Sequence, residues 1–352
     1  MFGWPGNLNE KMRKRNYITT ILILVVMVAS VPLRAQDPNF AQFFSSPLNI
    51  NPALTAHINA DWRVISNMRT QWVGPANPYL TGTVSFDSKL SQRQMWSEEG
   101  SYFGVGTMVM YDQAFANIVK STYLSQNISY SLVLNQGEKS TQRLIAGFGG
   151  IYGRRVVDFN RLTWEEQFVG NGFNTNLPTG EVALSNMKPY FSVTGGLVFN
   201  TSSDKSNWDI GVASFHINEP KQTFLEDPNQ DLARRNVAHS NFETMINAEL
   251  VLNLNAVYQF QREARYYSIG GGMGYFLPGA DRTIFNAGVW YWSVNSIIPY
   301  VGLAINDFQF GISYDITISK LRDAPRQPNS FELSLIYRGY RTMEKGLPCP
   351  WR

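Results

Sequence analysis

Residues that could carry out catalysis come close together in one place in this sequence. Ser214 and His216 stand two positions apart, and a serine beside a histidine can form the nucleophile and base of a hydrolase. Because strand side chains alternate between two faces, both residues would share a face. Nothing marks Ser214 as activated, however. We therefore expect His216 to be a hydrogen-bonded polar residue and the protein not to be an enzyme.

Metal, redox and nucleic-acid chemistry find no support in the sequence. The histidines at 57, 216 and 239 are scattered, and none has the spacing of a metal ligand. Cys349 is the single cysteine, which excludes an internal disulfide framework. Nucleic-acid binding would require a clustered basic face, which the sequence lacks. We predict no cofactor, no metal and no nucleic-acid partner.

The segment Gln36–Ala56, which we call the strap, has the clearest capacity for binding. Aromatic, proline and asparagine residues follow one another there with neither a helical nor a strand period. Burial of its apolar surface is favoured by ~25 cal/mol per Å², so the strap should tuck into the protein or dock on a partner. We expect tucking, with part of the surface left for a partner. The candidate plug or partner-binding residues are Asp37, Phe40, Phe43, Phe44, Pro47, Asn51 and Pro52.

An export signal precedes the strap. Basic residues within Lys11–Arg15 lead into the apolar run Ile18–Val31, and Ala35 supplies a small residue for cleavage. We predict cleavage after Ala35 and interpret residues 1–11 as the product of an upstream start codon. The formal charge of +3 then comes from the signal. An uncleaved anchor is the alternative, although the run is shorter than the ~20 residues of a spanning helix.

The body of the chain alternates between apolar and polar residues. In Ile118–Leu134 the even positions include Ile118, Leu124, Ile128 and Leu132, and the odd positions include Ser121, Ser125, Asn127 and Ser129. Met245–Phe260 and Phe308–Ser319 alternate in the same way. Each stretch exceeds the ~9–11 residues with which a tilted strand crosses a bilayer. Further candidate strands lie at 62–71, 80–90, 101–112, 142–153, 187–200, 207–217, 266–277, 283–293, 296–305 and 331–338.

These strands predict an all-β fold, a transmembrane antiparallel β-barrel of the outer membrane. Open sheet edges cannot be satisfied in lipid, so strands that span must close into a barrel. Such barrels normally have an even strand number, and we expect about fourteen, with twelve as the alternative. We assign the least obvious strand to Val156–Gln167. Aromatic residues expected in the interfacial girdles are Trp62, Trp72, Tyr79, Tyr111, Tyr258, Phe260, Trp290, Trp292 and Tyr300.

The expected organisation is a signal peptide (1–35), a periplasmic strap (36–60), a barrel (61–338) and a C-terminal tail (339–352). With an even strand number, strap and tail would both lie in the periplasm. Two long connections, Asn160–Asn186 and Asn218–Glu243, exceed ordinary loop lengths, and such loops are often functional.

Several blocks of the sequence resemble the PorP/SprF family of the type IX secretion and gliding machinery. The opening Gln36-Asp37-Pro38, with Phe40, Gln42, Phe43 and Asn51-Pro52-Ala53, is similar to the family's N-terminal pattern. Later blocks resemble the family in order and spacing: Trp62-Arg-Val, Arg69–Trp72, Ser214–Pro220, Asn306–Asp315, Phe331–Tyr337 and Pro348–Pro350.

The resemblance implies an outer-membrane component that helps to export, attach or move particular large surface proteins. The implied partners are outer-membrane lipid, periplasmic components of the type IX machinery and a large exported surface protein. A passive porin is the main alternative. It would favour a charged constriction and ~16 or more strands around an aqueous channel, whereas the polar faces here carry mostly Ser, Gly and Asn.

Overall fold

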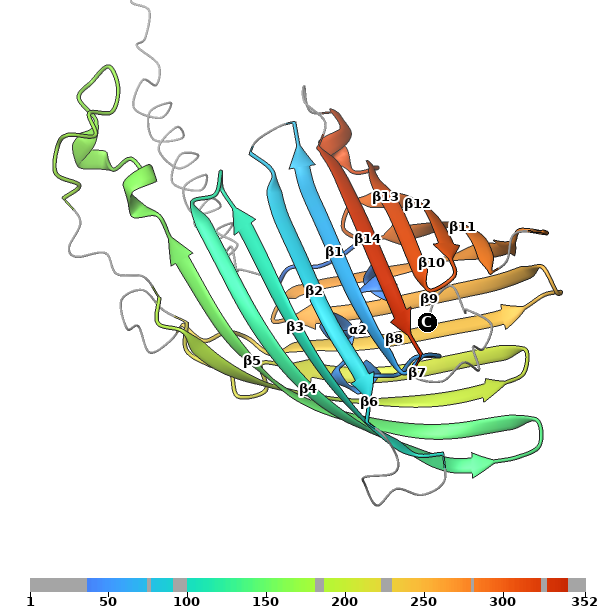
Figure 1. Ribbon diagram of the computed structural model, residues 1–352. Helices are drawn as coiled ribbons and strands as arrows, with labels where there is room; N and C mark the ends of the chain where they lie inside the picture. The colour runs from blue at the N-terminus through green and yellow to red at the C-terminus, as the bar shows by residue number, and fades with distance from the viewer. Residues whose placement is uncertain are drawn as a thin grey trace, which may run out of the picture. The chain divides into compact units, whose positions relative to one another are not determined.

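The computed structural model describes residues 37–74, 77–90, 100–180, 187–222, 230–279, 282–323 and 328–340. The expected signal peptide and residues 341–352 of the expected tail lie outside them. Within the described residues, fourteen strands form a closed antiparallel barrel in which β1 pairs with β14 (Figure 1). The predicted all-β barrel and its strand number are confirmed. No helix among the described residues is long and apolar enough to cross a bilayer.

The strands follow one another around the barrel in sequence order. They are β1 (Trp62–Val73), β2 (Tyr79–Lys89), β3 (Tyr102–Ala114), β4 (Val119–Gln136), β5 (Ser140–Val157), β6 (Tyr190–Ser203), β7 (Ser206–Phe215), β8 (Arg235–Met245), β9 (Leu250–Gln261), β10 (Ala264–Phe276), β11 (Thr283–Trp292), β12 (Ser296–Ile305), β13 (Phe308–Thr317) and β14 (Asn329–Gly339).

Alternation along each strand separates an apolar outer face from a polar inner face. On β4, Leu124 and Ile128 are 47% and 58% exposed, while the residues that directly follow them, Ser125 and Ser129, are buried. The inward positions of β13 are likewise polar, with Gln309, Ser313 and Asp315 buried. The outer face supplies the apolar surface that lipid requires.

The strand that was missing from the sequence-based candidates is β8. The assignment of a strand to Val156–Gln167 is wrong. β5 continues to Val157, and the residues after it form two short 3-10 turns, η4 (Phe159–Arg161) and η5 (Glu165–Gln167). The outward positions of β8 carry Asn236, Ala238, Ser240, Phe242 and Thr244. Only Phe242 among them is a large apolar residue, so the outer face is weakly apolar and the alternation is faint. The stretch Met245–Phe260 is not one strand, because β8 ends at Met245 and β9 starts at Leu250.

Three of the expected girdle residues are in fact inside the barrel. Trp290 and Tyr300 are 1% and 2% exposed, and Trp292 is also buried. Sequence position near a strand end predicted an interfacial aromatic, but the parity of β11 and β12 turns these side chains inward. They therefore belong to the packing of the lumen.

The two ends of the barrel differ in their connections. We call the end where β1 starts and β14 ends the turn end, because Trp62 pairs there with Gly339. It carries the connections 90–101, 137–139, 204–205, 246–249, 277–282 and 306–307. The opposite loop end carries 74–78, 115–118, 158–189, 216–234, 262–263, 293–295 and 318–328.

Both of the longest connections, 158–189 and 216–234, are at the loop end (Figure 1). The second is shorter than the expected Asn218–Glu243 because β8 occupies its last part. Outer-membrane barrels have short periplasmic turns and longer extracellular loops. We accordingly assign the loop end to the cell surface and the turn end to the periplasm.

Replacing Ile128 with arginine should lower the free energy of unfolding by about 2–4 kcal/mol, because it places a charge on the lipid-facing side midway along β4. Unfolding in lipid vesicles, followed by tryptophan fluorescence, measures this loss. Asn171→Arg, in the exposed connection after β5, is the control and should change stability by less than about 0.5 kcal/mol. Equal losses in the two variants would contradict the lipid-facing assignment.

Candidate functional site

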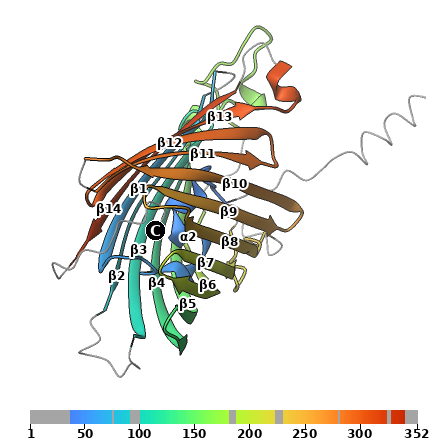
Figure 2. The same cartoon turned by 90° about the vertical axis from the view of Figure 1, so that its right-hand side faces the viewer.

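The described part of the strap and the residues up to Ala60 lie inside the barrel. Figures 1 and 2 show its short helix α2 (Pro47–Ile50) enclosed by the strands. The 3-10 turns η1 (Phe43–Ser45) and η2 (Pro52–Leu54) flank α2. Pro47 and Pro52 stand in the first turn of α2 and η2, where a missing backbone N–H costs no hydrogen bond. The strap is thus a chain of single helical turns, which explains why no period was visible.

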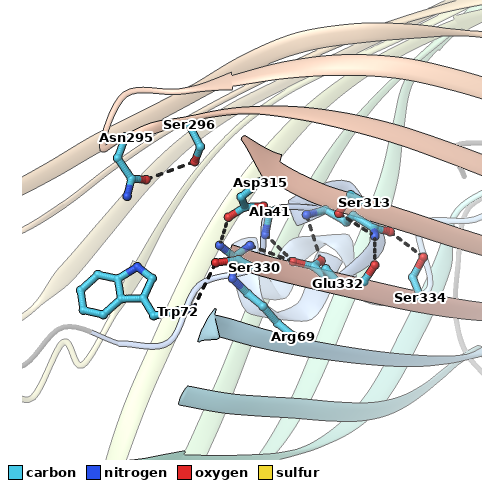
Figure 3. Close-up of polar contacts among 11 residues, drawn as sticks. Ala41, Arg69, Trp72, Asn295, Ser296, Ser313, Asp315, Ser330, Glu332 and Ser334 are labelled. Carbon is cyan, nitrogen blue, oxygen red and sulfur yellow. Dashed lines mark hydrogen bonds and ion pairs between the residues drawn. The ribbon is translucent and has the colours of Figure 1, made fainter. Parts of the chain in front are cut away.

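A buried ion network holds the first part of the strap against β1, β13 and β14 (Figure 3). Arg69 Nη1 lies 3.0 Å from Glu332 Oε2, and Arg69 Nη2 lies 2.5 Å from Asp315 Oδ2. The two carboxylate oxygens of Glu332 also accept hydrogen bonds from the backbone N–H groups of Ala41 (2.6 Å) and Gln42 (2.9 Å). All three ionic side chains are almost completely buried. We call Arg69, Asp315 and Glu332 the upper anchor.

The upper anchor needs the strap to be complete. A buried charge is costly unless an opposite charge and further hydrogen bonds compensate it. Arg69 shares its charge between two carboxylates, so the backbone N–H groups of the strap supply the remaining donors to Glu332. Charge-assisted bonds of this kind are short and roughly twice as strong as neutral ones. The strap therefore helps to stabilise the buried negative charge of Glu332 on the barrel wall.

The amide of Gln42 fixes the register of the strap on the same strands. Its Nε2 donates to Ser313 Oγ and to the Glu332 carbonyl, each at 3.0 Å. Ser334 Oγ donates to its Oε1 at 2.6 Å. A shift by one residue would leave this buried amide and its partners unsatisfied, at a cost of ~1–3 kcal/mol per group.

Aromatic contacts continue the attachment on β11 and β12. The ring of Phe44 lies 4.7 Å from that of Trp290 and 5.4 Å from that of Tyr300, measured between centroids. Phe43 contacts Phe44 edge-on at 5.8 Å. Pairs of this geometry add ~0.5–1.5 kcal/mol each beyond the burial of their area.

Asn51 bonds the middle of the strap to β6 and β7. Its Nδ2 donates to the carbonyl oxygens of Leu197 (3.2 Å) and Val212 (3.1 Å), while its Oδ1 accepts from Ala53 N–H (2.9 Å). Close approach is possible because the wall has glycine there. A Cβ at Gly147 would overlap the backbone of Ala53, and one at Gly196 would overlap the Asn51 amide.

A second ion pair, the lower anchor, holds the end of the strap. Arg63 and Asp87 form a two-bond pair at 2.8 and 2.9 Å, and Asp87 is fully buried. Asp87 Oδ2 also accepts from Ala56 N–H at 2.6 Å, and Arg63 Nη2 donates to the Leu54 carbonyl at 3.1 Å. The pattern matches the upper anchor: a wall carboxylate, a wall arginine and strap backbone.

Between the anchors, a cavity of about 70 Å³ remains beside the strap. Aromatic and aliphatic strap residues line one side, and polar side chains of β8 and β9, including Asn241 and Asn255, line the other. The cavity is large enough to hold water. The strap, together with inward side chains, therefore occupies this region of the lumen.

The candidate strap residues come together in the lumen. Phe40, Phe43, Pro47, Asn51 and Pro52 are buried, and Phe44 is half-buried against Trp290. Asp37, the first described residue, is also half-buried.

The sequence predicted a strap that tucks into the periplasmic mouth of the barrel, and in the structure the strap lies inside the barrel. Glu332 and Asp87, which accept hydrogen bonds from the backbone of the strap, lie on the inner wall of the barrel. The sequence analysis did not identify these carboxylates as site residues. Their signal was present: Asp315 stands on the polar face of a strand, where a charge requires an inward partner.

The Ser214–His216 pair does not form. His216 lies beyond the end of β7 with a left-handed backbone (φ 56°), so strand parity does not hold between the two residues. Its Nδ1 lies 2.7 Å from Ser192 Oγ on β6, and both side chains are buried. His216 is thus a hydrogen-bonded residue inside the barrel.

Gly147→Ala should impair assembly, because its methyl group would meet the backbone of Ala53. The folded fraction, read from heat-modifiable migration in electrophoresis, should fall. Gly195→Ala is the matched control, since its Cβ would make an ordinary contact with Ile217, and it should assemble normally. Equal assembly of the two variants would contradict the close approach of the strap to Gly147.

Comparison with known proteins gives a family for this barrel. A search of curated proteins finds no match. Among solved structures, a TodX deletion mutant, a monoaromatic hydrocarbon channel, has a TM-score of 0.48 at 11% identity, covering 82% of this chain and 92% of that one. The Pseudomonas putida toluene transporter TodX has a TM-score of 0.43 at 10% identity, with 83% and 92% coverage. Omp33 of Acinetobacter baumannii has 0.39 at 9%, with 79% and 98%.

The family model that describes the type IX secretion system membrane protein PorP/SprF matches residues 33–337. This range contains the strap, both anchors and nearly the whole barrel. A closed barrel with an apolar outer face and a membrane-protein family together put the chain in the outer membrane. The chain therefore belongs to the PorP/SprF family of type IX secretion system membrane proteins.

Proposed function

We propose that this protein supports the export, surface attachment or movement of specific large surface proteins, as a barrel component of the type IX secretion and gliding machinery. Its family membership carries the proposal, and the strap-filled lumen supports it. A lumen crossed by the protein's own chain leaves little space for a polypeptide. The barrel then serves as a scaffold that binds other components at its ends.

The proposed partners correspond to three surfaces. Outer-membrane lipid contacts the apolar outer face. Periplasmic components of the machinery contact the turn end, where the lower anchor and the short connections lie. The exported surface protein contacts the loop end, where the connections 158–189 and 216–234 extend. Long ordered loops are the usual place of binding residues on a rigid scaffold.

In this proposal, Asp37, Phe40, Phe43, Phe44, Pro47, Asn51 and Pro52 act first as a plug. The two anchors hold the strap at either end, and the aromatic residues fill the lumen between them. Because most of these side chains are buried, a partner would be contacted by the barrel ends that the strap braces, and less by the aromatic rings themselves.

Deleting the gene should reduce the surface display of one or a few large exported proteins while bulk secretion continues. Surface proteomics of intact cells, with the secreted fraction as the internal control, measures the effect. The Phe43→Ala, Phe44→Ala double variant should assemble and yet display less cargo, since it loosens the plug at Trp290. A surface proteome and motility identical to wild type after gene deletion would refute the proposal.

A passive porin makes a different prediction for conductance. The purified protein should be silent in planar bilayers, because the strap occupies the lumen. Removing residues 165–177 from the loop after β5 should also leave the bilayer silent, because the strap and not this loop occupies the lumen. Steady conductance by the intact protein would favour the porin.

A further inference from the structure

The direction of the strap through the lumen has a consequence for the topology of the protein. Asn39 accepts a hydrogen bond from Tyr266 (2.6 Å), which lies beside the start of β10. Ala41 and Gln42 bond to Glu332, close to the start of β14. Both strands start at the loop end. The first residues of the strap are therefore at the loop end.

The other two residues of the upper anchor, Asp315 and Arg69, also lie near the loop end. Asp315 stands close to the end of β13, which is also at the loop end. Arg69 lies near the last residues of β1, and its guanidinium is 4.8 Å from the ring of Trp292, the last residue of β11. Figure 3 shows Arg69, Asp315, Glu332 and Ala41 gathered at this one place.

The last residues of the strap lie at the opposite end. Ala56 bonds to Asp87, two residues before β2 ends. Lys89, the last residue of β2, donates to the Ile58 carbonyl at 2.6 Å. Arg63 of the lower anchor is the second residue of β1. All of these positions belong to the turn end, and β1 starts there directly after the strap.

Contacts between the two ends follow in order along the chain. Phe44 meets Trp290 and Tyr300 below the upper anchor. Asn51 meets the middle of β6 and β7. Thr55 accepts from Ser129 Oγ at 2.7 Å in the second half of β4, which runs toward the turn end. The strap thus crosses the whole lumen once, from the loop end to the turn end.

We propose that the start of the strap, at residues 38–39, opens to the cell surface, on the opposite side of the membrane from the end of β14. The contacts of Asn39, Ala41 and Gln42 carry this inference, because they hold the start of the strap at the loop end. A binding role of the N-terminus is then directed to an extracellular protein partner and not to a periplasmic one. The topology does not depend on which proteins the barrel serves.

The upper anchor makes this arrangement stable. Withdrawal of residues 39–42 from the lumen would remove two backbone donors from Glu332 and the Gln42 amide from Ser313 and Ser334. The buried carboxylates would keep only Arg69 as a partner. Retraction toward the turn end would also force Phe43 and Phe44 past Trp290. The N-terminus is therefore fixed at the surface in the assembled barrel.

Site-specific labelling on intact cells tests the proposal. In a Cys349→Ser background, which removes the single native cysteine, Pro38→Cys is compared with two controls. Asn171→Cys reports the loop end, and Asp204→Cys, in the exposed turn after β6, reports the turn end. A membrane-impermeant maleimide should label P38C and N171C on intact cells, and D204C only after the outer membrane is permeabilised. If P38C, like D204C, is labelled only after the outer membrane is permeabilised, the proposal is overturned.

A second measurement covers the case in which the half-buried position 38 reacts on neither side. A short epitope inserted between Gln36 and Asp37 supplies a tag whose detection does not depend on the exposure of position 38. Antibody binding to intact cells that carry heat-modifiable, assembled barrel supports the proposal. Antibody binding that appears only after permeabilisation overturns it. The same epitope inserted at Asp204 is the control for an intact outer membrane.

Discussion

The carboxylate of Glu332 is the group on which the rest of the structure depends. It is buried on the inner wall of a barrel, where an ion without partners is not tolerated. Arg69 supplies the opposite charge, and the backbone of Ala41 and Gln42 supplies the remaining donors. Arg69 in turn needs Asp315, since it carries the one positive charge between the two carboxylates. Neither the wall nor the strap satisfies its own polar groups there, so each is incomplete without the other.

Asp87 is a second buried wall carboxylate that needs a backbone donor from the strap. The two carboxylates together hold the strap inside the lumen. A barrel with polar inward faces would ordinarily hold water, and its Ser and Asn residues would bond to that water. Here the strap brings backbone donors to both anchors and an apolar filling between them, with glycines such as Gly147 in the wall where the backbone comes closest. The result is a barrel whose lumen is crossed by a buried segment of its own chain while its exterior is apolar.

The sequence predicted the strands correctly where apolar and polar residues alternate clearly within one strand. The alternation of β4 and β13 is visible because each has an apolar outer face, and that was enough to predict the barrel and its strand number. It failed for β8, whose outer face carries Asn236, Ala238 and Ser240. It also failed for the path of the strap, because that path is fixed by Glu332 and Asp87, which are far from the strap in sequence. Asp315 and Glu332 lie in blocks that carried the family resemblance, but a block of sequence does not reveal what its charges bind.

The position of the upper anchor couples the strap to closure of the barrel. Arg69 is on β1, Asp315 on β13 and Glu332 on β14, so the network spans the seam at which the first and last strands pair. Before closure, β1 and β14 are open edges, which lipid does not tolerate. Pairing them brings Arg69 to Glu332 and buries both charges, which is favourable once Ala41 and Gln42 are in place to complete the carboxylate. The strap should therefore lie in the lumen when the sheet closes, because closure without it would bury the charge of Glu332 without two of its donors. A segment that precedes β1 in the chain meets this requirement, since it is present before the last strand arrives.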